Sequence, residues 1–286
     1  MEIARFERMN PEPRSEADYG GRQTEAARRV LVDVGQVLAS FADSLVVVGG
    51  WAPDLLLPDA EEPHVGSIDV DLALNAAKLN DGRYADIVKL LLDTRRYRFG
   101  DKTFQLVADV DLKDGGIPVQ VEVEFLSAKN VRLRKHDPKL LENFRVLQVA
   151  AAGEAFRKPV EITLPGRDIR GSKNTVRLQV VSLADFLVMK AHAIGGRDKP
   201  KDTYDFCYCL EQSREGMAAL ANDWKERLGS RNVSAAITIL REKFESVDSF
   251  GPQQLVQFHA SADADEQAMH ARRAYELVQK FLKMLQ

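Results

Sequence analysis

The fold is decided by two neighbouring stretches, residues 46–51 (VVVGGW) and residues 64–74 (HVGSIDVDLAL). The first is an apolar run that ends on two glycines, and the second carries Asp69 and Asp71 one residue apart. Alternate side chains of a strand share a face, so both carboxylates should project together while apolar neighbours pack behind them. Two carboxylates this close repel each other unless a cation lies between them. A divalent metal such as Mg²⁺ is the usual solution, whereas the alternative interpretation is an acidic pair beside a turn.

The bulk composition is that of a globular protein with one large domain or two moderate ones. The chain has 286 residues, of which 45% are hydrophobic and 29% charged, with a net charge of -3. This balance excludes a global basic field, although a local basic surface remains a candidate for nucleic-acid binding. That candidate, whose simpler interpretation is a solvated face, consists of Arg132, Arg134, Lys135 and Lys139.

The cysteines and the hydropathy pattern predict a cytoplasmic protein that has no membrane partner. Cys207 and Cys209 lie two residues apart in a helical pattern, point in different directions, and are expected to be reduced core residues. We see no signal-peptide core and no apolar run of the length of a membrane span.

The pattern of apolar residues predicts an α+β fold, a mixed sheet flanked by helices and followed by a helical C-terminal domain. We expect a flexible leader over 1–22, an α/β domain over 23–181 and helices over 182–286. The expected strands are 45–48, 68–74, 99–110, 117–126, 160–164 and 176–181, and the expected helices of the first domain are 23–42, 51–57 and 85–92. Ser182, followed three residues later by Asp185, resembles a capping box that starts the helical part.

A third carboxylate is expected on the strand 117–126. Its sequence alternates almost strictly, so Glu122 and Glu124 share the face opposite the valines. A two-metal phosphoryl-transfer site needs one acidic residue beyond the bridging pair, and either glutamate could supply it. The alternative is an ordinary polar strand face.

The order of these motifs resembles the DNA polymerase beta-like nucleotidyltransferase superfamily. The resembling residues are Gly49, Gly50, Ser67, Asp69 and Asp71, followed later by residues 123–126 (VEFL). The resemblance implies that the glycines open a nucleoside triphosphate site, that the aspartates bind magnesium, and that Glu124, rather than Glu122, completes the metal ligands. Two departures are the glutamate in place of the more frequent aspartate and the long gap between Gly50 and Asp69.

A second motif, residues 190–206 (KAHAIGGRDKPKDTYDF), resembles the C-terminal motif of AbiEii/AbiGii-type toxins. The resemblance implies that Lys190 contacts the nucleotide phosphates and that Asp205 lies near it. A lysine there would neutralise charge that develops on the triphosphate. The simpler interpretation is that Asp202 caps a helix and that Arg197 and Lys199 are solvated.

These resemblances imply an enzyme that binds one or two Mg²⁺ ions and uses a nucleoside triphosphate (NTP) as its substrate. It would move a nucleoside monophosphate to an acceptor hydroxyl on tRNA, another RNA or a protein, and an antitoxin would be its partner. One site carboxylate is the candidate to deprotonate that hydroxyl. The alternatives are a degenerate nucleotide-binding or interaction module and an antibiotic-type transferase for small molecules. His64, just before the aspartates, is either a phosphate contact or a loop histidine.

Overall fold

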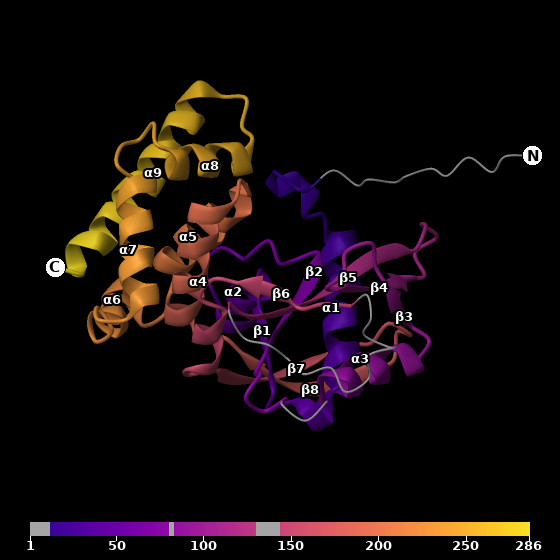
Figure 1. Ribbon diagram of the computed structural model, residues 1–286. Helices are drawn as coiled ribbons and strands as arrows, with labels where there is room; N and C mark the ends of the chain where they lie inside the picture. Colours follow the sequence, from indigo (N-terminus) through magenta and orange to yellow (C-terminus); the bar gives the residue numbers. More distant parts are fainter. Residues whose placement is uncertain (1–11, 80–82, 130–143) are drawn as a thin grey trace, which may run out of the picture.

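A mixed sheet forms the first part of the protein (Figure 1). The computed structural model describes residues 12–79, 83–129 and 144–286. Its strands are β1 (Leu45–Val48), β2 (Asp69–Leu74), β3 (Tyr97–Phe99), β4 (Gln105–Val110), β5 (Val119–Ala128), β6 (Leu147–Val149), β7 (Val160–Arg167) and β8 (Lys173–Val180). The order across the sheet is β3-β4-β5-β2-β1-β8-β7, with β6 beside β5. β2 runs antiparallel to β1 and parallel to β5, which puts both acidic stretches side by side at the centre.

Helix α1 (Gly21–Val37) crosses one face of the sheet. It contacts β5, β7 and β8, and α3 (Arg83–Asp93) lies beside it. Its inward residues, including Val30 and Leu31, are fully buried, as expected for an amphipathic helix on a sheet. Gly35 allows a close approach, because a Cβ there would come within 2.7 Å of the Leu178 side chain.

The second part of the protein is helical, as the sequence predicts. It consists of α4 (Leu183–Gly196), α5 (Pro200–Gln212), α6 (Gly216–Lys225), α7 (Arg231–Lys243), α8 (Phe250–His259) and α9 (Ala264–Met284), which gather beside the sheet (Figure 1). Ser182 caps α4, since its Oγ accepts a hydrogen bond from the amide of Asp185. The indole of Trp224 donates to the carbonyl of Ala184, and its ring meets Phe281 edge-on in the core. The fold class is therefore confirmed.

The segment before α1 is fastened to the helical region. It contains a short 3₁₀ helix, η1 (Glu16–Asp18). Arg14 donates to Asp198 and to Gln257, and Glu16 lies 3.1 Å from the ring of His259. The buried ring of Tyr19 packs against Phe258, with centroids 5.9 Å apart. The division into leader, α/β domain and helical domain stays a prediction.

The structure corrects the expected strand over 99–110. The chain turns at Gly100, whose amide donates to the carbonyl of Gln105, so that β3 and β4 form an antiparallel pair. Strand β6 was not expected, because three residues are too few to show alternation. β7 and β8 extend beyond the expected bounds, since an antiparallel pair continues until its turn.

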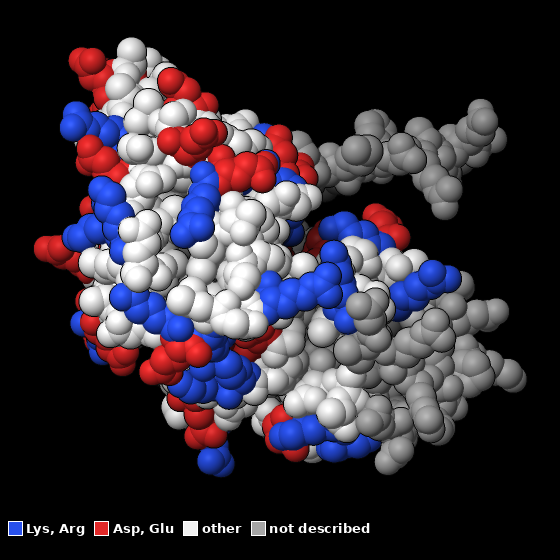
Figure 2. Space-filling view, turned by 60° about the vertical axis from the view of Figure 1, so that its left-hand side comes forward, with Lys and Arg blue, Asp and Glu red and all other residues white. Residues whose placement is uncertain are grey.

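Surface charge and hydropathy show two further properties of the described residues. Figure 2 shows Lys and Arg interspersed with Asp and Glu over the helical region, so neither sign dominates this face. Within the described ranges, no helix is both long enough and apolar enough to cross a membrane. The basic candidate formed by Arg132, Arg134, Lys135 and Lys139 lies outside the described residues.

A buried carboxylate joins α1 to the segment between α3 and β3. Asp33 is 1% exposed and accepts from the Tyr97 hydroxyl at 2.7 Å and from Arg96 at 3.1 Å. We expect Asp33→Ala to lower the free energy of unfolding by about 2 kcal/mol, because it leaves both donors without their acceptor. Denaturant unfolding measures this, with Asp109→Ala as control. Asp109 pairs with Arg98 at the surface, so its loss should cost less than about 1 kcal/mol. Equal effects would contradict the assignment.

Candidate active site

The turn after β1 is shaped by two glycines. Gly49 has φ +68°, a conformation that favours glycine, and a Cβ there would overlap Oδ2 of Asp71. A Cβ on Gly50 would lie 2.7 Å from Nζ of Lys201 and 2.8 Å from Oγ of Ser67. The bare backbone therefore lets a carboxylate, an ammonium and a hydroxyl approach the same turn. Helix α2 (Trp51–Leu56) begins directly after it.

Strand β2 presents both aspartates beside this turn. Val48 lies opposite Asp71 in the β1–β2 pair. The hydroxyl of Ser67 donates to Asp69 at 2.5 Å, and the indole of Trp51 donates to the Asp69 carbonyl at 2.7 Å. Val70 and Leu72 are buried on the other side, as strand alternation requires. The shared face predicted for the aspartates is therefore observed.

The two aspartates differ in their protonation. Burial raises the pKa of Asp71 to about 8, helped by the negative charges of Asp69 and Glu124. Burial acts in the same direction on Asp69, but Lys199 and the Ser67 hydroxyl outweigh it and lower the pKa of that carboxyl. Without a cation beside it, Asp71 therefore favours its neutral form.

Both glutamates of β5 lie on the aspartate face. Glu122 is opposite Asp69, and Glu124 is opposite Asp71. The Glu124 side chain is 14% exposed against 42% for Glu122, so Glu124 lies deeper in the site. Nζ of Lys102 is 3.1 Å from Glu124 and 3.5 Å from Glu122. Gln105 also donates to Glu124, at 3.2 Å.

The donor chemistry fits a hard divalent cation. Carboxylate oxygens are the ligands that Mg²⁺ prefers, and a cation beside Asp71 would offset the repulsion from Asp69 and Glu124. Among the described residues, no three His, Cys, Asp or Glu side chains are already drawn together as a metal site. The carboxylate of Glu124 is bound to Lys102 and Gln105.

Buried ion pairs join α4 to α5 next to the site. Nζ of Lys190 lies 2.7 Å from Asp202 and 2.7 Å from Asp205, and all three residues are buried. Arg197 donates to both oxygens of Asp202. The two carboxylates raise the pKa of Lys190 against the effect of burial. Lys190 and Asp205 therefore meet, as expected, but the Lys190 ammonium is already shared between two carboxylates.

Lys201 is a cation that sequence reasoning did not single out. Its Nζ lies 2.7 Å from Asp205 and is the atom closest to the side-chain position of Gly50. Burial, together with Lys190 and Lys199, lowers the pKa of Lys201. The sequence does contain a signal for this residue, because Lys201 is the third cation of the motif in residues 197–205 (RDKPKDTYD). Lys102, on the turn before β4, had no such signal.

His64 is a buried structural residue with a defined tautomer. The amide of Gly66 donates to Nδ1 of His64 at 3.0 Å, so the proton is on Nε2, which lies 2.9 Å from Asp205 and donates to it. Its ring stacks on Tyr204 and meets Tyr208 edge-on. The phosphate-contact interpretation is not supported, because both ring nitrogens are used.

The other singled-out residues have structural contacts. Cys207 and Cys209 are both buried and free, as expected for core residues. The ring of His192 bonds the carbonyl of Asn232, on α7. Asp202 does not cap α5, since Lys199 is the N-cap residue and Asp202 binds Lys190 and Arg197.

This sheet, with its glycine turn, paired aspartates and neighbouring glutamates, is the arrangement of a nucleotidyl transferase. The family model "Nucleotidyl transferase AbiEii toxin, Type IV TA system" matches residues 29–285. The chain therefore belongs to the AbiEii family of nucleotidyl transferase toxins, as its motifs suggested. A comparison with curated proteins gives no match.

Gly49→Ala should abolish nucleotide transfer and destabilise the fold. The alanine would adopt a left-handed conformation, costing about 1–2 kcal/mol, and would also displace the Asp71 carboxylate. Gly115→Ala is the matched control, since Gly115 has φ +81° and nothing within 4 Å of the added Cβ. We expect the control to share the strain and keep activity. Full activity in Gly49→Ala, measured beside thermal unfolding, would refute this account.

The buried His64 should make stability depend on pH. Burial first, and Lys201 second, lower the pKa of His64 to about 4. The unfolded chain, with an ordinary histidine pKa near 6.5, then binds one more proton than the folded protein between about pH 6.5 and pH 4. The wild type should lose stability as pH falls through this window, by at most about 1.4 kcal/mol per unit. His64→Gln should lack this component in urea unfolding. Parallel pH profiles for the two proteins would contradict a neutral buried histidine.

Proposed function

We propose that this family member transfers a nucleoside monophosphate from an NTP to an acceptor hydroxyl, with Mg²⁺ held by Asp69, Asp71 and Glu124. The observation that carries the proposal is the position of Asp71, which lies against the bare turn at Gly49 and opposite Glu124. A triphosphate-bound cation would favour the ionised form of this carboxyl, which burial, Asp69 and Glu124 oppose.

The residues around the metal ligands suit a triphosphate. Gly49 and Gly50 put backbone without side chains at the start of α2, and Ser67 offers a hydroxyl close to Gly50. Lys201, whose Nζ is the atom nearest the Cβ position of Gly50, puts an ammonium group behind the turn. When bound, Mg²⁺ would polarise the phosphate and neutralise charge on the reacting oxygens.

The reaction forms a bond between the acceptor oxygen and the α-phosphorus and breaks the bond to pyrophosphate. The acceptor hydroxyl gives its proton to one of the site carboxylates, and the cations near Gly50 stabilise the charge that develops on the phosphates. The proposed acceptor is RNA such as tRNA, with a protein hydroxyl and a small molecule as the other outcomes of the assay. As a member of a type IV toxin family, the protein has an antitoxin as its proposed partner.

The test is label transfer from each α-labelled NTP, with Mg²⁺, to molecules of a cell extract. Asp69→Asn and Asp71→Asn should lower transfer by about 10³-fold or more, because several kcal/mol of charge stabilisation is lost. Glu124→Gln should lower it strongly and Glu122→Gln weakly, since Glu124 is the deeper residue and faces Asp71. A chelator should abolish transfer.

The outcome of the extract assay also separates the alternatives. Label in RNA that ribonuclease removes supports the RNA acceptor, and label that protease removes supports a protein. Transfer that survives removal of macromolecules indicates a small-molecule acceptor. Intact NTP binding with no label in any fraction would defeat the enzyme and leave a nucleotide-binding module.

A further inference from the structure

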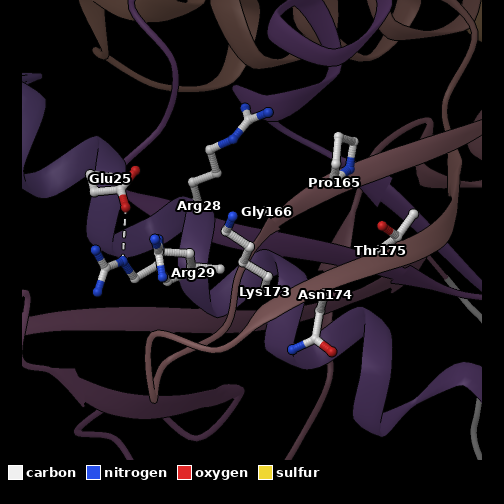
Figure 3. A pocket seen from close by; sticks show the side chains of 9 residues that line it. Glu25, Arg28, Arg29, Pro165, Gly166, Lys173, Asn174 and Thr175 are labelled. Atoms are coloured by element: carbon white, nitrogen blue, oxygen red, sulfur yellow. Dashed lines mark hydrogen bonds and ion pairs between the residues drawn. The ribbon is translucent and has the colours of Figure 1, made fainter.

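An open basic cleft lies outside the candidate active site. It has a volume of about 700 Å³ and runs between α1 and the β7–β8 hairpin (Figure 3). Its cations are Arg28 and Arg29 from the helix and Arg167 and Lys173 from the hairpin. The only carboxylate in the described lining is Glu25, which pairs with Arg29 at 2.8 Å. The cleft, which we call the hairpin cleft, is therefore positively charged.

The hairpin half of the cleft holds positive charge without a carboxylate to balance it. Arg167 and Lys173 are directly opposite each other in the β7–β8 pair. Like charges in this position repel and destabilise a strand pair. Arg167 donates only to the carbonyl of Gly171, and Lys173 has no ion pair within the described part of the chain. An anionic ligand would remove this repulsion.

The hairpin that carries these cations is rigidly shaped. The buried carboxylate of Asp168 accepts from the amides of Arg170 and Ser172 and from the side chain of Asn174. On the other side, Gly166 packs closely on α1, where an added Cβ would come within 2.8 Å of Val32. The cations are thus presented from a fixed turn.

The hairpin cleft extends toward the candidate active site. Arg28 pairs with Asp54 of α2 at 3.2 Å, and α2 is the helix that begins at the glycine turn. One turn earlier on α1, Thr24 lies 3.4 Å from the Cβ position of Gly66, three residues before Asp69. Leu72 lies on the α1 side of the sheet, so Asp69 and Asp71 point to the opposite side, and a polymer held in the cleft would reach them around the α2 end of the strands.

We infer that the hairpin cleft binds the phosphodiester backbone of the acceptor RNA. The inference rests on the proposed function. The cations of the cleft are spread over two elements, which suits a chain of phosphates better than one compact triphosphate. Among the described lining residues there is no aromatic side chain to hold a base. The cleft therefore binds the phosphodiester backbone of the RNA without reading its sequence. The end of the RNA that carries the reacting hydroxyl passes Arg28 and extends toward Asp69.

The test is the binding of a fluorescent single-stranded oligoribonucleotide to the full chain, followed by anisotropy over a salt series. Arg167→Ala with Lys173→Ala should weaken binding about tenfold and lower the salt slope by about 1.4, because each lost phosphate contact contributes about 0.7. The matched control is Lys225→Ala with Arg241→Ala, two exposed cations of the helical region that make no ion pair within the described residues. The control should retain the wild-type slope.

Independent measurements separate this inference from the proposed function. Thermal unfolding should occur at no lower temperature in the cleft variant, which loses a repulsive pair, and should be unchanged in the control variant. Binding of a fluorescent NTP should be unchanged in the cleft variant. If the salt slope of the cleft variant is unaltered while the wild type still labels RNA, the hairpin cleft does not bind the acceptor RNA. The proposed function would then still stand. Loss of NTP binding in the cleft variant would show a triphosphate site instead, and labelling of protein alone would exclude RNA as the occupant. RNA binding that depends on the cleft, without label transfer, would defeat the proposed function alone.

Discussion

The structure depends on a group of buried charges that can exist only together. Lys190, Lys201, Asp202 and Asp205 are almost without solvent contact, and each has its opposite charge within 2.7 Å. A buried charge that loses its partner costs several kcal/mol, so these residues fix how α4 and α5 pack. Asp205 also holds His64, and through it the loop that leads to β2. The helices thereby set the position of the glycine turn and of the strand that carries the aspartates.

At the centre of the sheet, unlike between α4 and α5, the negative side chains are not fully paired with cations. There, negative side chains gather on one face of β2 and β5, and burial keeps Asp71 poorly ionised. The nearby cations serve other carboxylates: Lys102 binds the glutamates, and Lys190 binds Asp202 and Asp205. The protein thus pairs its internal charges fully beside the site and incompletely within it. Such an imbalance is typical of sites that take up a charged ligand.

Much of this site follows from the sequence, for physical reasons that differ between residues. Strand alternation suffices to put Asp69 with Asp71 and Glu122 with Glu124, because side-chain direction in a strand has a period of two. The preference for Glu124 came from a resemblance, and the register with Asp71 agrees with it. The contacts of Lys102, His64 and Tyr19 could not be predicted, since each arises between segments far apart in the chain. Likewise, the close approach of Lys201 to Gly50 depends on how α5 packs against the turn.

The segment before α1 has a mechanical consequence. The helical region leaves the sheet through the covalent link from β8 to α4, and it is also held by the contacts of Arg14, Glu16 and Tyr19 with Asp198 and α8. Together with the bond between His64 and Asp205 and the ion pairs of Arg157 with Asp185 and Asp223, these contacts attach the helical region at several separate places. A shearing force on one attachment is therefore shared by the others, and Lys201 keeps its position beside the glycine turn.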